Sequence, residues 1–239
     1  MRRHGPAEGP RDAARGASPA SHFLLLHLQG RWDDALALAR GMVAKDQTFI
    51  AAPQHHLFAA GTAAILLARG KPAGAARLIA GERGTHEGHT EIFLDVAEAA
   101  VLRTLGRPDA ADRLLRRGLR EADARGYVYG TDELAAALAT LRAEDGRADA
   151  AAACLWRLQE LAGRTGSGRT RLLYLLAAAR VREQGSGAAR EMLHEAVDLA
   201  RSRCQPFETA GTLTAAAGEA GPRSCCTRRT NCTGRRARC

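Results

Sequence analysis

Aromatic side chains, lysine and long apolar runs are scarce in this chain of 239 residues. Only 4% of the residues are aromatic, and apolar and polar residues show no sustained alternation, which argues against a β-sheet protein. No apolar run approaches the roughly 20 residues of a membrane-spanning helix. The N-terminal arginines precede no apolar segment of the kind found in secretory signals. We therefore expect an all-α, cytoplasmic protein without a membrane partner.

Basic residues are almost entirely arginine, because the 35 Lys and Arg include only Lys45 and Lys71 as lysines. With abundant Ala and Gly, this bias is typical of a high-GC bacterial genome. The net charge of +9 lies mainly in the ends of the chain. Residues 1–22 carry +2 and residues 222–239 carry +6, which leaves +1 (9 − 2 − 6) for the body. A nearly neutral body is poor evidence for a nucleic-acid surface, because phosphate binding needs clustered cations.

A short phrase, glycine and a basic residue followed by an Ala-rich amphipathic run, recurs along the chain. It begins at Gly30, Gly70, Gly106, Gly146 and, more loosely, Gly185, at intervals of 40, 36, 40 and 39 residues. A period in this range indicates stacked helix pairs, in which the phrase connects the two helices of a pair.

The pattern of glycine, proline and capping residues predicts about five helix pairs and one extra helix. Ser21, Thr90 and Thr131 are the candidate N-caps. The expected helices cover residues 21–29, 31–45, 53–69, 72–81, 90–105, 108–125, 132–144, 147–163, 169–183, 187–203 and 206–218. The expected organisation is a disordered leader (1–20), one tetratricopeptide-like domain (21–218) and a disordered basic Cys/Arg tail (219–239).

Small residues near the start of each second helix permit a close crossing with the first helix. These residues are Ala35, Ala76, Ala111 and Ala151. One pair cannot bury its apolar face alone, so neighbouring pairs should stack into an α-solenoid with a concave superhelical groove. A single globular helical bundle is the alternative. The regular spacing favours the solenoid.

Two phrases near the end of the array, Ala188–Ala200 and Gln205–Leu213, carry a more specific resemblance. The segment from Gly185 to Ala217 resembles the end of the helical-repeat region in large ATP-dependent LuxR-family bacterial transcriptional regulators. In that family an ATP-binding switch domain precedes the repeats and a DNA-binding helix-turn-helix domain follows them. The resemblance implies an interaction and sensor region over about residues 21–218. Such a region would bind a protein, peptide or small inducer in the groove.

The chain departs from that family in lacking its two flanking domains. The only Gly-Lys pair, Gly70-Lys71, lies in an expected inter-helix turn and not in a phosphate loop. We therefore predict neither ATPase activity nor direct DNA binding, and DNA would be reached only through a domain absent from this chain. A free-standing tetratricopeptide-like adaptor is the alternative function. A third alternative, an enzyme, has no support from particular residues, so we predict no catalytic, cofactor-binding or metal-binding residues.

The tail from Ser224 to Cys239 allows three interpretations. A zinc site would use Cys225, Cys226, Cys232 and Cys239, but adjacent cysteines chelate one ion poorly. A basic nucleic-acid-binding tail fits the charge. The third is a frameshift: permitted codons for Ser224–Gly234, read two bases later, encode Leu-Leu-His-Glu-Ala-Tyr-Glu-Leu-Tyr-Gly, which is similar to Met192–Leu199. We favour the frameshift, which predicts that the gene continues in that frame into a helix-turn-helix domain.

Other residues that could carry chemistry have simpler structural interpretations. His86 and His89 are one residue too close for the zinc-protease pattern, and Gly88 favours a loop. We expect one of the two residues His55 and His56 to be exposed and the other to be packed. Trp32, Trp156, Cys154 and Cys204 are expected to be buried, and the Tyr127–Tyr129 turn is expected to be packed, with ligand binding as its alternative.

Overall fold

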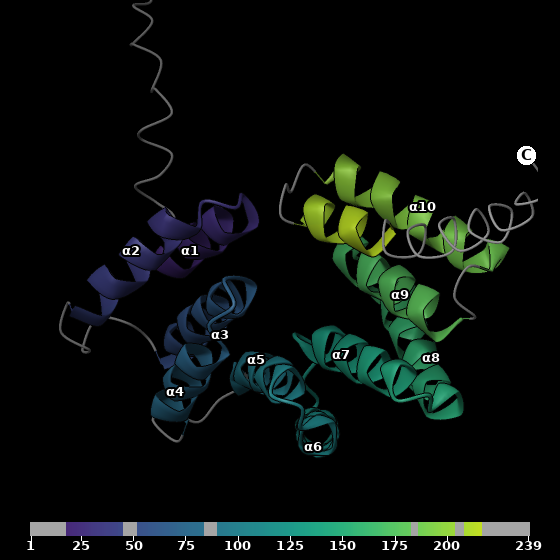
Figure 1. Cartoon of the computed structure of the whole chain (residues 1–239), viewed down its shortest axis with the longest axis horizontal. Coiled ribbons are helices and arrows are strands. Elements are labelled where there is room, and N and C mark those ends of the chain that lie inside the picture. Colours follow the sequence, from purple (N-terminus) through teal and green to yellow (C-terminus); the bar gives the residue numbers. More distant parts are fainter. Residues whose placement is uncertain (1–17, 45–51, 84–89, 183–185, 204–207, 217–239) are drawn as a thin grey trace, which may run out of the picture. The chain divides into compact units, whose positions relative to one another are not determined.

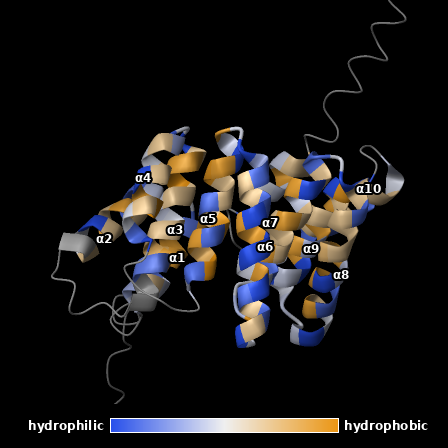
Figure 2. Ribbon diagram, turned by 90° about the horizontal axis from the view of Figure 1, so that it is seen from below, coloured by the Kyte–Doolittle hydropathy of each residue, from blue (hydrophilic) through white to orange (hydrophobic). Residues whose placement is uncertain are grey.

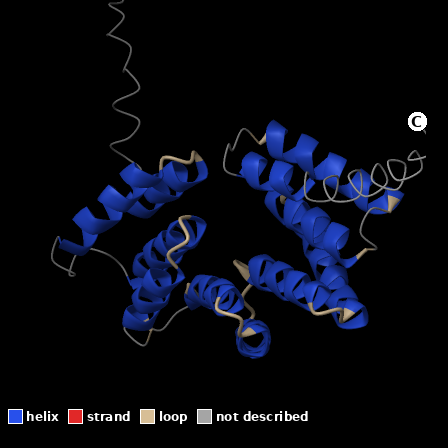
Figure 3. Cartoon of the chain, in the orientation of Figure 1, coloured by secondary structure: helices blue, strands red, loops and turns tan. Residues whose placement is uncertain are grey.

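The computed structural model describes residues 18–44, 52–83, 90–182, 186–203 and 208–216. Within these ranges the chain forms ten helices and a further helical segment at 208–216, and no strand occurs among them (Figure 3). This confirms the all-α prediction, and the paired helices are compatible with an α-solenoid. The predicted leader (1–20) lies almost wholly outside the described residues, as does the predicted tail (219–239). His86, His89 and Cys204 also lie outside them.

The chain divides into two compact units, Met1–Ala97 and Glu98–Cys239, with the boundary inside α5 (Figure 1). Unit 1 contains α1 (Pro19–Leu28), α2 (Trp32–Ala44), α3 (Ala52–Ala68), α4 (Pro72–Glu82) and the start of α5 (Glu91–Thr104). Unit 2 contains the rest of α5, α6 (Pro108–Arg125), α7 (Thr131–Glu144), α8 (Ala148–Thr165), α9 (Gly168–Val181), α10 (Gly187–Ser202) and the 208–216 segment. Odd-numbered helices are the first helices of their pairs, and even-numbered helices are the second.

The recurring phrase forms the same turn in four pairs. Gly30, Gly70, Gly106 and Gly146 have φ values of 73°, 69°, 72° and 73°, in the left-handed region that glycine adopts most easily. In the fourth copy the Gly146 amide donates to the Ala143 carbonyl, and the Arg147 amide donates to the Arg142 carbonyl. These backbone bonds satisfy the carbonyls at the helix end, as in a Schellman motif, and the other three copies repeat them.

Each second helix then has a buried alanine near its start, as the sequence predicts for Ala35, Ala111 and Ala151. Ala35, Ala111, Ala151 and Ala189 are all at most 1% exposed. In α4 the buried residue is Ala75 and not Ala76, which is half-buried, so the sequence register was one residue off there. The repeated alanine permits the close helix crossing that a larger side chain would prevent.

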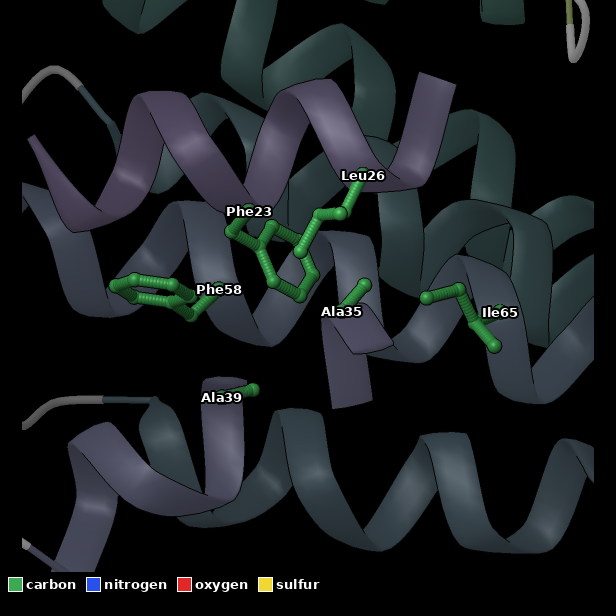
Figure 4. Close-up of a cluster of buried hydrophobic side chains, with 6 residues drawn as sticks. All are labelled: Phe23, Leu26, Ala35, Ala39, Phe58 and Ile65. Carbon is green, nitrogen blue, oxygen red and sulfur yellow. The ribbon is translucent and has the colours of Figure 1, made fainter. Parts of the chain in front are cut away.

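The core of unit 1 is built around aromatic rings. Phe23 of α1 and Phe58 of α3 meet edge to face at 5.1 Å between ring centroids, and Ala35, Ala39, Leu26 and Ile65 complete the cluster (Figure 4). Trp32 packs against this cluster, as predicted. Gly61 lies beneath the Phe23 ring, where an added Cβ would come within 2.3 Å of Phe23 Cε1. His56 is fully buried and His55 is half-buried, which agrees with the predicted split.

Unit 2 has an alanine- and leucine-rich core. α7 packs on α6, α8 and α9, and α9 packs on α8 and α10, as their succession in Figure 1 shows. Leu134, Leu138, Leu158 and Leu175 are at most 2% exposed. Blue turns follow the outer side of α6 in Figure 2, as expected for an amphipathic second helix.

Two predicted N-caps are wrong. Helix α1 begins at Pro19, and the Ser18 side chain caps it by accepting the Ser21 amide. The cap of α7 is Gly130, and the Thr131 hydroxyl instead donates to the Tyr127 carbonyl at 2.9 Å. Thr90 directly precedes α5, and its hydroxyl lies 3.1 Å from His56 Nδ1. Among the described residues, no helix is both long and apolar enough to cross a membrane.

Candidate binding face of the first helices

The solvent-facing side of α7 is a strip of four residues at helical spacing. Glu133, Ala137, Thr140 and Glu144 lie at i, i+4, i+7 and i+11, and the residues around the rest of the helix are mainly buried. The strip has a carboxylate at each end and small side chains between them. All four side chains come from α7, and the helix that packs beside α7 completes the surface.

The strip of α9 repeats this spacing one repeat later, with opposite charge and larger apolar groups. It comprises Arg169, Leu173, Leu176 and Arg180, each 36 residues after its counterpart on α7. Two ion pairs confirm the register. Arg169 Nη2 lies 2.8 Å from Glu133 Oε1, and Arg180 Nη1 lies 3.5 Å from Glu144 Oε1. The two first helices therefore run side by side in the same direction.

The ion pairs extend beyond these two helices at both ends. At the N-terminal end Arg169 also pairs with Glu208 of the 208–216 segment at 2.5 Å, and Arg203 pairs with the same carboxylate at 3.0 Å. At the C-terminal end both oxygens of Glu144 lie 3.0 Å from Arg103 Nη1 of α5. Arginine–carboxylate pairs thus join α7 and α9 at both ends, α5 and α7 at the C-terminal end, and α9 and the 208–216 segment at the N-terminal end.

The charged groups at the N-terminal end are partly desolvated. Glu208 has a side chain only 9% exposed, and Glu133 is half-buried. Burial opposes the charge of Arg169, but Glu133 and Glu208 outweigh it, so the pKa of Arg169 is raised further above its ordinary value. A neighbouring hydrogen bond from the Thr170 hydroxyl to Asp132 at 2.8 Å ties α9 to α7 at the same end. These contacts fix the distance between α7 and α9 at their N-terminal ends.

The middle of the face is apolar and partly open. Leu173 and Leu176 are half-buried, and Leu176 also packs toward α10. Their counterparts on α7 are Ala137 and Thr140, which are much smaller. We call these eight residues of α7 and α9 the first-helix face. It presents apolar side chains between two charged borders, an arrangement that is common where proteins bind one another.

A second polar cluster lies between α6, α7 and α8. The Asp112 side chain is only 6% exposed and accepts hydrogen bonds from Arg116 at 2.7 Å and from Arg142 and Arg147 at 3.1 Å each. Burial opposes its ionisation, but the hydrogen bond from Arg142 and the three arginine charges lower the pKa of Asp112 below its ordinary value. Three arginines from α6, α7 and the start of α8 occupy this buried carboxylate, so we assign it to holding these helices together.

The single residues discussed in the sequence have mixed outcomes. Cys154 is buried, as predicted, and burial raises the pKa of its thiol, so it is not an activated nucleophile. Trp156 is 68% exposed, which overturns the prediction that it is packed. The prediction of a packed turn also fails at Val128 and Tyr129, which are 55% and 61% exposed. In both cases the side chain lies on a side of its element that the described helices leave exposed.

The sequence did not single out the first-helix face, although its signal was present. Arg169 and Arg180 lie one repeat after Glu133 and Glu144, so comparing equivalent positions of successive repeats would have paired them. Within the described part of the chain, no three His, Cys, Asp or Glu side chains are placed to hold a metal ion. The chain matches no known protein-family model, and neither a curated protein nor a solved structure is significantly similar to it.

Proposed function

We propose that this chain is the helical-repeat interaction and regulatory region of a LuxR-type transcriptional regulator, and that its first-helix face binds the regulatory partner. The observation that carries the binding role is the open leucine pair, Leu173 and Leu176, held between charged borders by contacts at both helix ends. The resemblance of Gly185–Ala217 to the repeat region of those regulators supports the wider assignment.

The chemistry of the face favours a peptide with apolar side chains and polar ends. An apolar anchor would cover Leu173 and Leu176, which gains roughly 25 cal/mol for each Å² of apolar surface removed from water. Arginines and carboxylates at the borders would orient the peptide by charge, which adds specificity more than affinity. Binding would bias a switch domain attached to the repeats, because a ligand shifts an equilibrium by its differential affinity.

The binding role is tested by selecting peptides from a random library on the full chain and measuring their affinity by calorimetry. Leu173→Asp should weaken a selected peptide about tenfold or more, because it places a charge in the apolar centre of the face. The matched control is Leu25→Asp, which alters a leucine of α1 that is already 52% exposed. Equal affinities of both variants for every selected peptide would refute binding at this face.

The regulator assignment is tested separately by reading the gene and its surroundings. An ATP-binding domain encoded upstream and a helix-turn-helix domain in the frame two bases later, after codon 224, would support it. The free-standing adaptor would instead show neither. Specific DNA binding by residues 21–218 alone would contradict the proposal, because the DNA would then be read by the repeats.

A further inference from the structure

The exposed side of α6 carries four arginines within two turns of the helix. They occupy positions i, i+3, i+4 and i+7, which share one side of a helix. All four are exposed, and we call them the α6 arginine face: Arg113, Arg116, Arg117 and Arg120. The opposite side of the helix is buried, and α6 packs on α7. The arginine face is therefore a compact positive patch that is turned toward solvent.

The exposed side of α10 has the same spacing and the opposite charge. We call its four exposed residues the α10 acidic face: Glu191, His194, Glu195 and Asp198. The buried side of α10 includes Leu193, Ala196 and Val197, and α10 packs on α9. Two helices of unit 2 thus present the same four positions, one helix with positive and the other with mainly negative side chains.

The first and last residues of each face keep their charge for a partner outside the chain. In the part of the chain that the structure describes, no ion pair involves Arg113, Arg120, Glu191 or Asp198. The residues between them are partly engaged within the chain, Arg116 with Asp112 at 2.7 Å, Arg117 with Glu121 at 3.7 Å and Glu195 with Arg171 at 2.8 Å. The available charges of both faces are therefore two residues that lie seven positions apart.

We propose that the α6 arginine face of one copy binds the α10 acidic face of a second copy, so that chains associate head to tail. Seven residues of a helix rise about 10.5 Å, so the free charges have the same separation on both faces. Arg113 and Arg120 therefore meet Glu191 and Asp198 whether the two helices run parallel or antiparallel. Because the contact joins different surfaces of the two copies, each chain can bind one neighbour through α6 and another through α10.

A nucleic acid is the competing partner for the arginine face. Phosphate binding needs clustered cations, but α6 as a whole carries five arginines and four acids, a net charge of only +1 (5 − 4). Asp109, Glu121 and Asp123 are exposed on the same helix, and a phosphate backbone that runs past the arginines would be repelled by them. A single helix of matching spacing would contact the arginines alone, and α10 of a second copy is such a helix.

The inference goes beyond the proposed function and does not depend on it. Every residue of the two faces belongs to a second helix of a pair, whereas the first-helix face belongs to α7 and α9. Head-to-tail association can therefore hold or fail without any change in peptide binding at the first-helix face.

The first test is charge reversal in the full chain under reducing conditions, followed by sedimentation velocity. The mass of the wild type should rise with concentration above the 25.4 kDa of one chain, and added salt should reverse the rise. R113E/R120E should raise the dissociation constant about tenfold or more, and so should E191R/D198R, because like charges then face each other. The variant that combines all four changes should return to within about threefold of the wild type.

The second test mixes the two reversed variants in equal amounts. R113E/R120E has two acidic faces and E191R/D198R has two basic faces, so neither binds itself but each complements the other. The mixture should associate like the wild type. The two variants have net charges of +5 (9 − 4) and +13 (9 + 4), so attraction between oppositely charged molecules cannot explain an association.

The control R40E/R77E reverses two exposed arginines on α2 and α4 and gives the same net charge as R113E/R120E. It should associate like the wild type. A wild type that stays monomeric up to its solubility limit would overturn the proposal. So would a combined variant and a mixture that both stay monomeric while circular dichroism shows normal helicity. Retention of DNA by a monomeric wild type, lost in R113E/R120E, would establish a nucleic acid as the partner instead.

Discussion

Unit 1 and unit 2 differ in whether an aromatic contact joins successive helices. In unit 1, α1 and α3 are joined by the Phe23–Phe58 ring contact, and the ion pair between Arg69 and Asp33 accompanies it. In unit 2, arginine–carboxylate pairs recur one repeat apart over an alanine- and leucine-rich core. The same turn and the same close helix crossing therefore occur with an added aromatic contact in unit 1 and with ion pairs in both units.

The largest effect should come from removing an aromatic ring in unit 1. Phe58→Ala should lower the free energy of unfolding by about 3–5 kcal/mol, because it leaves a cavity beneath Phe23. Urea unfolding measures the loss, and hydrogen exchange should show it in α1 and α3 first. The control is Leu25→Ala, at a largely exposed position of α1. A cost below 1 kcal/mol would mean that the ring contact does not join these helices.

The substitution Asp112→Asn tests the ionic contacts of unit 2, because it removes the charge of a buried carboxylate that three arginines share. We expect a loss of about 2–4 kcal/mol at pH 7, because Arg142, 15% exposed, keeps its buried charge without a carboxylate. Asp109→Asn, on the exposed side of the same helix, should cost less than about 0.5 kcal/mol.

The pH dependence follows from the lowered pKa of Asp112. Its stabilisation is complete above the ordinary value of 3.8 and is lost as the pH falls through the lower folded-state value. The stability difference between wild type and Asp112→Asn should therefore be largest near neutral pH and shrink in more acidic solution. A difference that stays constant from pH 7 to pH 2.5 would contradict the role of the carboxylate charge.

A smaller effect is expected where α3 approaches α1. Gly61→Ala should cost about 1–3 kcal/mol, because its methyl group would overlap the Phe23 ring unless the ring moves. In the Phe23→Leu background the same substitution should cost less, since the ring is gone. Thermal unfolding of the four variants measures this coupling, and additive effects would show that the ring and the glycine do not touch.

The smallest effect concerns the turn that both units share. Gly146→Ala should cost about 1–2 kcal/mol, because an alanine at φ 73° is strained although no atom lies within 4 Å of its Cβ. Gly163→Ala, in the exposed part of α8 and equally unobstructed, should instead stabilise the chain by about 0.5–1 kcal/mol. Equal effects of the two substitutions would mean that the turn does not require a left-handed residue.

The sequence predicted the helices and turns well because glycine and alanine at fixed spacing act locally. Gly146 and Ala151 do in the structure what their positions predict. Trp156 was misplaced because a large apolar side chain is assumed to be buried, and only the neighbouring helices decide which side of α8 is covered. Thr131 was wrongly predicted as a cap because Gly130 already occupies that position in a left-handed conformation.

Net charge concealed where the charges lie. A body charge near +1 is poor evidence for a nucleic-acid surface, but a sum cannot distinguish scattered charges from separated ones. In the structure, Arg113 and Arg120 are exposed on α6, whereas Glu191 and Asp198 are exposed on α10. The first-helix face was missed for a similar reason. The pairing of Arg169 with Glu133 can be recognised in the sequence only when equivalent positions of successive repeats are compared.

The shared turn also bears on how such an array can change length. Each copy is closed by backbone hydrogen bonds around one left-handed glycine, and no particular side chain is needed to complete it. A duplication or deletion with ends at two of these glycines joins one turn to another of the same geometry. Recombination within the gene can therefore add or remove a whole repeat without creating a new kind of connection, and only the contacts between the faces must be refitted afterwards.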